Sequence, residues 1–301
     1  MDFTQKHGND YLGYLFAILA AVMFGFVSTL AKPLVSNVNP LLLASIIYLI
    51  AAITLTPLAQ KQSFPHTKKN YLLILVISIL GAVIAPSLYF TGLTHTSASD
   101  TALLANGEIF FSVLLAIVFF KEKLKPLGYI ATGLVLVGLI IVTTNLDFTD
   151  FTLQSIHYGD ALVIMAMLFW AVDNNLSRLV AQKINVAKIA QIKSAIGGIM
   201  LLGIVVFVFD IQINIQESQV LPILLLGTLG FAVSLYFFLQ SLKIIHTVRT
   251  VMIFSTSSIV GLGAAALFLQ EPIGFYQIIS VIIMIFGIYL LNRKESLIKL
   301  M

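Results

Sequence analysis

The sequence predicts an all-α integral membrane protein with ten transmembrane helices, arranged as two inverted five-helix repeats. The first observation is composition: of 301 residues, 59% are hydrophobic and 10% are charged, and the mean hydropathy is +1.03. A soluble globule of this size would lack polar residues to cover its surface. The other two observations are a series of apolar stretches of spanning length and an internal repeat. Together they predict the whole chain to lie in a membrane.

A helix needs roughly 20 apolar residues to cross the hydrocarbon core. Because the runs are continuous rather than alternating in polarity, they are typical of helices and not of membrane β-strands. Short connections leave no room for a separate soluble domain. The expected spans are 11–31, 40–59, 71–92, 101–120, 126–145, 159–181, 187–208, 220–243, 250–270 and 273–292.

The basic residues predict the orientation. With these spans, all Lys and Arg except Lys32 and Lys193 lie on one side, in loops, termini or span ends, whereas 145–160 and 210–219 on the other side hold acids and no Lys or Arg. The excess of positive charge marks the cytoplasmic side. We therefore expect a multi-pass protein of the inner or cytoplasmic membrane with both termini in the cytoplasm. Topology also explains the basic clusters, so no nucleic-acid partner is expected.

Two parts of the chain repeat. The segment 101–124 aligns without a gap with 250–273, and SLYF at 87–90 recurs at 234–237. Five spans per half is an odd number, so the halves, 1–148 and 149–301, should enter the membrane from opposite sides. Inverted repeats of this kind are typical of secondary transporters, whose substrate site lies near the midplane where the halves meet.

Each half closes with an apolar helix, a Glu and a final glycine-containing helix. The motifs are FFKEKL before GLVLVGLIIV and FLQEPI before ISVIIMIFGIYLL. In this pattern the chain resembles, over nearly its whole length, the EamA family of the drug/metabolite transporter superfamily. The resemblance implies ten helices as inverted repeats, cytoplasmic termini and alternating access in a secondary carrier that is not an enzyme and needs no cofactor. It does not imply a substrate, because members carry very different compounds.

Glu108 is the first candidate for chemistry. It lies about seven residues into the fourth expected span, and on a continuous helix it shares a small and polar stripe with Thr101, Ala105 and Ser112. A carboxyl group in hydrocarbon is costly enough to be a functional hypothesis by default. We expect it to bind a proton or a cation, with a structural hydrogen bond to a neighbouring helix as the alternative.

The second candidate is Asp173 in WAVDNNLSRL, which follows twelve apolar residues of the sixth span. Three consecutive polar side chains cannot face lipid, so Asp173 should bind a substrate or a coupling proton. Alternatively, an ion pair with Arg178 or Lys193 only locks the helices together. Further candidates for the pocket are Asn106, Trp170, Asn174, Asn175, Tyr89, Tyr236 and Ser257.

Other patterns indicate structure rather than chemistry. Glu122 and Glu271 end apolar spans, where an acid can cap the following helix. None of the five histidines lies in an expected span and the chain has no cysteine, so no metal site is expected. No nucleotide-binding motif is present, which argues against ATP-driven transport.

The sequence therefore predicts a secondary-active transporter, a monomer or homodimer, for a small polar or amphipathic metabolite such as an amino acid, amine or drug-like compound. Protons are the expected coupling ion, and the family resemblance favours an exporter. A second hypothesis is an uncoupled uniporter or electrogenic carrier of a cationic metabolite. A more remote one is a membrane enzyme without transport activity, which would need a nucleophile or metal cluster that the short outer loops do not offer.

Overall fold

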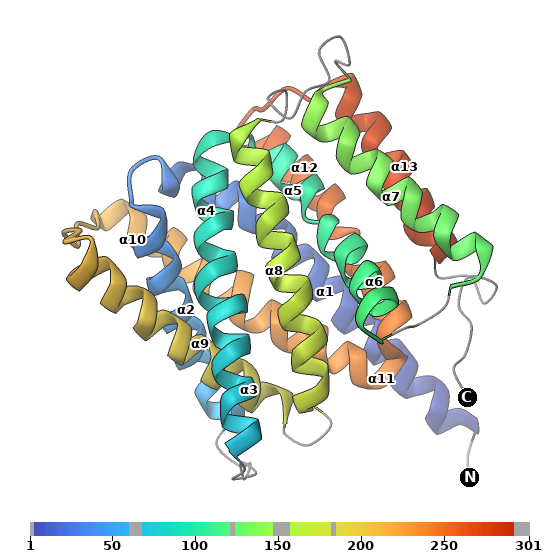
Figure 1. The fold of residues 1–301 in the computed structure, drawn as a ribbon, viewed down its shortest axis with the longest axis horizontal. Helices are drawn as coiled ribbons and strands as arrows, with labels where there is room; N and C mark the ends of the chain where they lie inside the picture. Colours follow the sequence, from blue (N-terminus) through green and yellow to red (C-terminus); the bar gives the residue numbers. More distant parts are fainter. Residues whose placement is uncertain (1–2, 60–67, 121–123, 147–156, 182–184, 292–301) are drawn as a thin grey trace.

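The computed structural model describes residues 3–59, 68–120, 124–146, 157–181 and 185–291. These residues form a bundle of helices lying side by side (Figure 1). The first half of the chain contributes α1 Phe3–Val35, α2 Pro40–Ala59, α3 Lys68–Ile79, the π-helical segment η1 Leu80–Ile84, α4 Ala85–His95, α5 Ala98–Leu104, α6 Gly107–Phe120 and α7 Pro126–Thr144.

The second half contributes a similar series of helices. These are α8 Tyr158–Ala181, α9 Val186–Gly203, the π-helical segment η3 Ile204–Val208, α10 Glu217–Leu225, the π-helical segment η4 Leu226–Val233, α11 Ser234–Phe254, α12 Ser257–Phe268 and α13 Phe275–Leu291. Local sequence sets several of the helix starts. Asn39 accepts hydrogen bonds from the first backbone N–H groups of α2, and Asn185 does the same for α9, as N-cap residues do.

Seven helical stretches in the described part of the chain are long and apolar enough to cross a membrane. They are Tyr11–Val35, Pro40–Ala59, Asn70–His95, Ala98–Leu115, Pro126–Thr144, Val186–Val208 and Glu217–Ser241. Two shorter apolar helices, Ser257–Phe268 and Phe275–Leu290, accompany them. The helix α8, which carries Asp173 and two asparagines, is not among the seven. With seven such stretches, the chain is a multi-pass membrane protein.

The fourth and ninth expected spans are not continuous helices, which corrects the stripe predicted for Glu108. The first is interrupted at Ala105 and Asn106, between α5 and α6, and the second at Ser255 and Thr256, between α11 and α12. At both places the backbone forms tighter turns, in which an N–H group donates to the carbonyl oxygen three residues earlier, as Glu108 does to Ala105. Asn, Gly and Ser are weak helix formers and tolerate such turns, so the repeat carries its interruption in both halves.

The boundary between the eighth and ninth expected spans also differs from the prediction. The helix α11 runs unbroken from Ser234 to Phe254, through the stretch where a loop was expected between 243 and 250. Two of the three π-helical segments occupy corresponding places: η1 lies just before the SLYF sequence at Ser87, and η4 just before the one at Ser234. Such segments widen a helix locally and often lie at functional sites.

Helix pairs formed by residues far apart in sequence build the bundle. The helix α2 packs along α9 and α7 packs along α13, at opposite edges of Figure 1. Between them, α1 packs on α11 and α12, and α8 packs on α4 and α6. The main buried cluster runs through these contacts, with Tyr89, Phe90 and Met167 among its fully enclosed side chains.

Glycines allow the closest of these contacts. A Cβ atom added to Gly287 of α13 would lie 2.8 Å from the carbonyl oxygen of Ala131 in α7. On the other helix, a Cβ atom at Gly138 would meet Met284 of α13. Association of helices in lipid depends on such close packing, because lipid chains are as apolar as the helix surfaces.

Candidate functional site

A cavity in the middle of the bundle brings together residues of both halves. It has a volume of about 90 Å³. Its lining includes five residues predicted from the sequence, Glu108, Trp170, Asp173, Asn174 and Lys193, together with aromatic side chains from α1, α2, η4 and α11. The two carboxyl groups, which are 65 residues apart in the chain, thus face the same space.

Glu108 lies in the first turn of α6, directly after the helix interruption. Its Oε1 accepts a hydrogen bond of 2.6 Å from Nδ2 of Asn174 in α8. The N-terminal turn of a helix carries partial positive charge and favours a nearby carboxylate. The interruption therefore both turns Glu108 into the cavity and places it where a negative charge is tolerated.

Asp173 is held differently, by an ion pair with Lys193 of α9. Both side chains are buried, and Ser177 donates a further hydrogen bond of 3.1 Å to Asp173 Oδ1. The sequence left Arg178 and Lys193 as alternative partners; the partner found is Lys193, and the side chain of Arg178 lies outside the described part. The carboxylate also occupies the space beside Gly81, where a Cβ atom would collide with it.

These contacts give the two carboxyl groups different charge balances. Lys193 with Asp173 is the one ion pair found among the described side chains, and as a unit it is formally neutral. The hydrogen bond to Glu108 comes from a neutral amide. Glu108 is therefore the acid whose charge a bound proton or cation could still balance.

The wall beside Asp173 is fixed by one backbone carbonyl. The carbonyl oxygen of Gly81 in η1 accepts hydrogen bonds of 2.9 Å from both Tyr48 Oη and Trp170 Nε1. Tyr89, predicted for the pocket, packs behind this wall with its ring centroid 5.3 Å from that of Trp170. The π-helical segment thus orients two aromatic side chains from different helices.

Four phenylalanines complete the aromatic lining. Phe24 lies 6.4 Å from Phe231 and 5.2 Å from Phe254 between ring centroids, and Phe238 lies 4.7 Å from Phe254. Sequence analysis missed these four residues and Tyr48. Because 22 phenylalanines are spread through the chain, no local signal distinguishes those that converge on the cavity.

The remaining predicted pocket residues do not line the cavity. Asn106 is buried at the helix interruption and donates hydrogen bonds to Ser258 Oγ at 3.0 Å and Met284 Sδ at 3.4 Å. Asn175 donates to the carbonyl of Ala171 in its own helix. Ser257 is buried in the first turn of α12, and Tyr236 packs beside Phe237. Of these contacts, those of Asn106 link different helices, whereas those of Asn175 and Tyr236 stay within their own helices.

Glu271 corrects the prediction that it caps the helix that follows it. Its carboxylate accepts hydrogen bonds of 2.9 Å from the backbone N–H groups of Ala98 and Ser99 and one of 2.6 Å from Ser99 Oγ. It therefore caps α5, a helix of the other half of the chain. The equivalent residue, Glu122, lies outside the described residues.

Further polar contacts surround this cap. Gln277 and Tyr276 of α13 donate to Asp100 of α5. Next to it, Thr96 donates to Asp160 of α8, and Lys32 of α1 donates to the carbonyl oxygens of Leu93 and Thr96. We call this set the cap network. It ties α1, α5, α8 and α13 together about ten residues, or roughly 15 Å of helix, from Glu108.

Comparisons with known proteins agree with this architecture. The model of the EamA-like transporter family matches the chain twice, over residues 11–144 and 157–293. An uncharacterized transporter of Methanothermobacter thermautotrophicus is 31% identical over 296 residues, covering 93% of this chain and 85% of the relative. An uncharacterized transporter of Clostridium kluyveri is 24% identical over 301 residues, covering 95% and 96%.

A solved crystal structure shares the fold, with a TM-score of 0.66 at 15% sequence identity over 92% of this chain and 95% of that chain. A shorter match, 31% identical over 117 residues, is to a WAT1-related protein of Arabidopsis thaliana, covering 36% of this chain and 31% of the plant protein. The two family matches together span almost all of the helices described above. The chain therefore belongs to the EamA-like transporter family.

Proposed function

We propose that this chain is a secondary-active transporter that works by alternating access, with residues 1–148 and 149–301 as inverted five-helix repeats. The double family match supports two copies of one unit. The packing supports their relation, because the main contacts of α1 have counterparts: α1 on α11 and α12 corresponds to α8 on α4 and α6. The interruptions before α6 and α12 correspond within one residue. With an odd number of spans per repeat, the halves have opposite orientations in the cytoplasmic membrane, and both termini are cytoplasmic.

The substrate is a small amphipathic metabolite that carries a positively charged amine. The observation that supports this best is the single carboxylate without a cationic partner, Glu108, in a cavity whose walls are aromatic. Aromatic faces attract cations, most strongly where water is excluded. The Asp173–Lys193 pair lines the same cavity as a formally neutral unit, so in this proposal Glu108 binds the charged amine of the substrate.

Protons are the coupling ion in this proposal. Glu108 can be neutralised by a proton or by a cationic substrate, but not by both at once. A proton that binds from the outside displaces the substrate there, and a substrate that binds from the cytoplasm displaces the proton inward. An inward proton gradient then drives the cation outward, so competition for one carboxylate makes the protein an exporter.

Alternating access requires that the cavity open to one side at a time. The cap network supports closure at the predicted outer end, because it joins helices of both halves through buried polar contacts. Glu271 on α5 and Gln277 on Asp100 each connect residues more than 170 positions apart. In the outward-open state these contacts would have to break together.

The test is substrate-driven proton movement by the purified protein in liposomes, with a panel of amines, amino acids and drug-like cations. We expect an amine to release protons in the wild type and Glu108→Gln to reduce that signal at least tenfold. Binding, followed by the fluorescence of Trp170, the single tryptophan of the chain, should persist for neutral analogues. Glu217→Gln is the matched control, because Glu217 is an exposed acid at the start of α10.

The other outcomes separate the alternatives. Transport of a cation without proton movement, unaffected by Glu108→Gln, would identify the uncoupled or electrogenic carrier. If no compound moves and none changes the fluorescence of Trp170, transport itself is the wrong function and an enzymatic role must be sought.

A further inference from the structure

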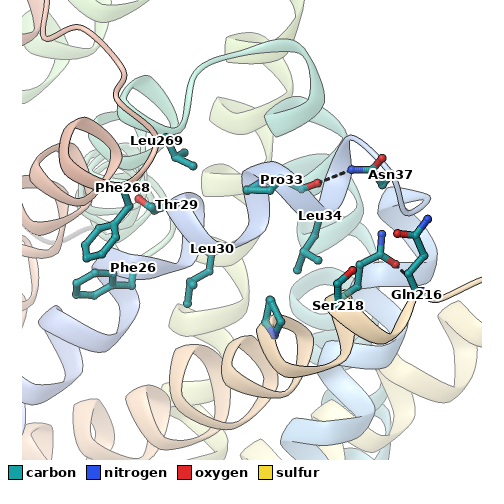
Figure 2. Close-up of a pocket in the computed structure, with 12 residues that line it drawn as sticks. Phe26, Thr29, Leu30, Pro33, Leu34, Asn37, Gln216, Ser218, Phe268 and Leu269 are labelled. Atoms are coloured by element: carbon teal, nitrogen blue, oxygen red, sulfur yellow. Dashed lines mark hydrogen bonds between the residues drawn. The ribbon is translucent and has the colours of Figure 1, made fainter.

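A second and larger cavity lies between α1, the start of α10 and the end of α12. It has a volume of about 480 Å³, against about 90 Å³ for the central cavity. Figure 2 shows its floor, which runs along α1 from Phe26 to Leu34 and on to Asn37 in the turn after the helix, and its sides, which include Ser218 and Phe268. We call it the outer groove. Its volume is in the range of sites for small organic molecules.

The lining of the outer groove is apolar at one end and polar at the other. Phe26 and Phe268 meet edge to face at the inner end, with ring centroids 6.0 Å apart. Asn37 and Gln216 lie at the opposite end, and Leu30 and Pro33 lie between (Figure 2). The residues of α1 from Phe26 to its end at Val35 span roughly 14 Å, about half of the hydrocarbon core. The groove therefore fits an amphipathic molecule in the outer half of the membrane.

One hydroxyl group in the groove has no partner. Thr29 is 4% exposed, and its Oγ1 finds no hydrogen-bond partner in the described structure. Threonines inside helices usually bond to their own backbone, and a buried hydroxyl without a partner is unfavourable. Figure 2 shows this oxygen beside Phe268, at the apolar end. A hydrocarbon chain would leave it unsatisfied, whereas a molecule with a polar group at that depth would pair with it.

The helix α1 borders both cavities, the outer groove with Leu30 and the central cavity with Phe24, and we call its contact with η4 the partition between them. Val27 packs on Gly230, where an added Cβ atom would lie 3.0 Å from Val27 Cγ2, and Phe24 packs against Phe231. Gly230 and Phe231 line the central cavity and belong to η4. Because a π-helical segment has fewer ideal backbone bonds than an α-helix, it is a natural place for this partition to open.

We propose that the outer groove is a second binding site for the transported amphipathic amine, which passes between the groove and the central cavity by way of the Val27–Gly230 partition. The polar group of the substrate pairs with Thr29 Oγ1, and its apolar part packs against the rings of Phe26 and Phe268. This inference rests on the proposed function for the identity of the ligand, and it adds that exchange with the outer side occurs laterally, through the outer half of the membrane.

Binding is tested with 4-bromobenzylamine, whose bromine quenches tryptophan fluorescence on contact. The reporter is Phe268→Trp in a Trp170→Phe background, and the control is Leu267→Trp in the same background. Both positions are exposed, at 69% and 79%, but only Phe268 lines the groove. We expect saturable quenching at position 268 and unsaturable quenching at 267. Thr29→Val should weaken saturable binding roughly two- to tenfold, the value of one hydrogen bond, and Thr29→Ser should preserve it.

Two results would overturn the site. One is unsaturable quenching at both positions, which means simple partitioning into lipid. The other is saturable quenching at position 268 by a brominated phospholipid that the amine does not displace, which means that a lipid occupies the groove.

The route is tested by transport. Leu30→Phe fills the groove and should slow amine transport at least tenfold while binding at Trp170 is kept. Ile18→Phe, at an exposed position of α1 outside the groove, should have no effect. Normal transport by Leu30→Phe overturns the route and leaves the proposed function intact. A wild type that moves no amine refutes the proposed function, and the quenching experiment still judges the groove.

Discussion

At the scale of single residues, the central cavity holds two acids that look alike in the sequence but have different contacts. Asp173 is fully enclosed, with Lys193 and Ser177 as its partners. Glu108 is partly exposed to the cavity and is bound by one amide. A buried ion pair is weak evidence for stability, whereas in the proposed cycle the acid without a cation is the one that changes its charge state.

The first prediction concerns the ion pair. Lys193→Met should lower the free energy of unfolding by about 3–5 kcal/mol, because it leaves the carboxylate of Asp173 buried without its cation. Adding Asp173→Asn should restore most of that loss. Thermal unfolding in detergent of both single variants and the double variant measures the coupling. Additive losses would show that the two groups do not interact.

The hydrogen bond between Asn174 and Glu108 gives a second prediction at this scale. Asn174→Leu should lower the affinity for a cationic substrate, because the carboxylate loses the donor that orients it. The expected change is about two- to tenfold. Titration of Trp170 fluorescence checks it. Asn175→Leu is the control, since Asn175 donates to its own helix, and an equal loss there would contradict the assignment.

At the scale of helices, interruptions and close contacts set the positions of these residues. The turn at Ala105 and Asn106 starts a new helix and directs Glu108 inward. The segment η1 frees the carbonyl of Gly81 to hold Tyr48 and Trp170. Composition alone favoured ten uninterrupted spans, because Asn, Gly and Ser within an apolar run are too common to predict a turn at a given residue.

The contact between α7 and α13 gives a prediction at this scale. Gly287→Ala should lower the free energy of unfolding by about 1–3 kcal/mol, since its Cβ atom meets a backbone carbonyl that cannot move aside. Gly133→Ala, in α7, is the matched control, because nothing lies within 4 Å of that position. Thermal unfolding should show a loss for the first variant and none for the second.

The contact of Glu271 with the start of α5 gives another prediction at the scale of helices. Glu271→Ala removes the acceptor of two backbone N–H groups and of Ser99 Oγ, so the start of α5 should loosen. The chain has no native cysteine, and Ala98→Cys can therefore report access directly. We expect faster labelling of this cysteine by a membrane-impermeant maleimide when Glu271→Ala is added. Glu217→Ala serves as the control, and unchanged rates would mean that the cap does not close this end.

At the scale of the whole molecule, each half supplies part of one cavity. Glu108 comes from the first half and Asn174 from the second, so the hydrogen bond between them forms only when the two halves pack together. The lateral position of the outer groove, between α1 and α10, follows from the same assembly.

Orientation of the halves gives the last prediction. In inverted repeats the fifth and tenth spans begin on opposite sides. In right-side-out vesicles, an impermeant maleimide should label Pro272→Cys from outside, whereas Lys125→Cys should react only after the membrane is opened. Both positions are exposed. Labelling of both from the same side would rule out an inverted arrangement.

The sequence by itself determined the membrane character, the helical class, the family and the internal repeat, because these depend on average composition, span length and motif spacing. It also singled out Glu108 and Asp173, since an acid within an apolar run is conspicuous wherever it lies. The partner of Asp173 remained open between Lys193 and Arg178, because both choices satisfy the same charge balance.

Only the tertiary structure decided which residues meet. In the structure Lys193 pairs with Asp173, and Tyr48 and four phenylalanines line the cavity around the carboxylates. Five residues predicted for the pocket are not in its lining: Asn106, Asn175, Ser257, Tyr89 and Tyr236. The structure also joins Glu271 to α5 rather than to the following helix. The physical reason is that these helices are hydrophobic on nearly every face, so the sequence does not show which face points into the protein. Packing against helices far along the chain decides which face lines the cavity.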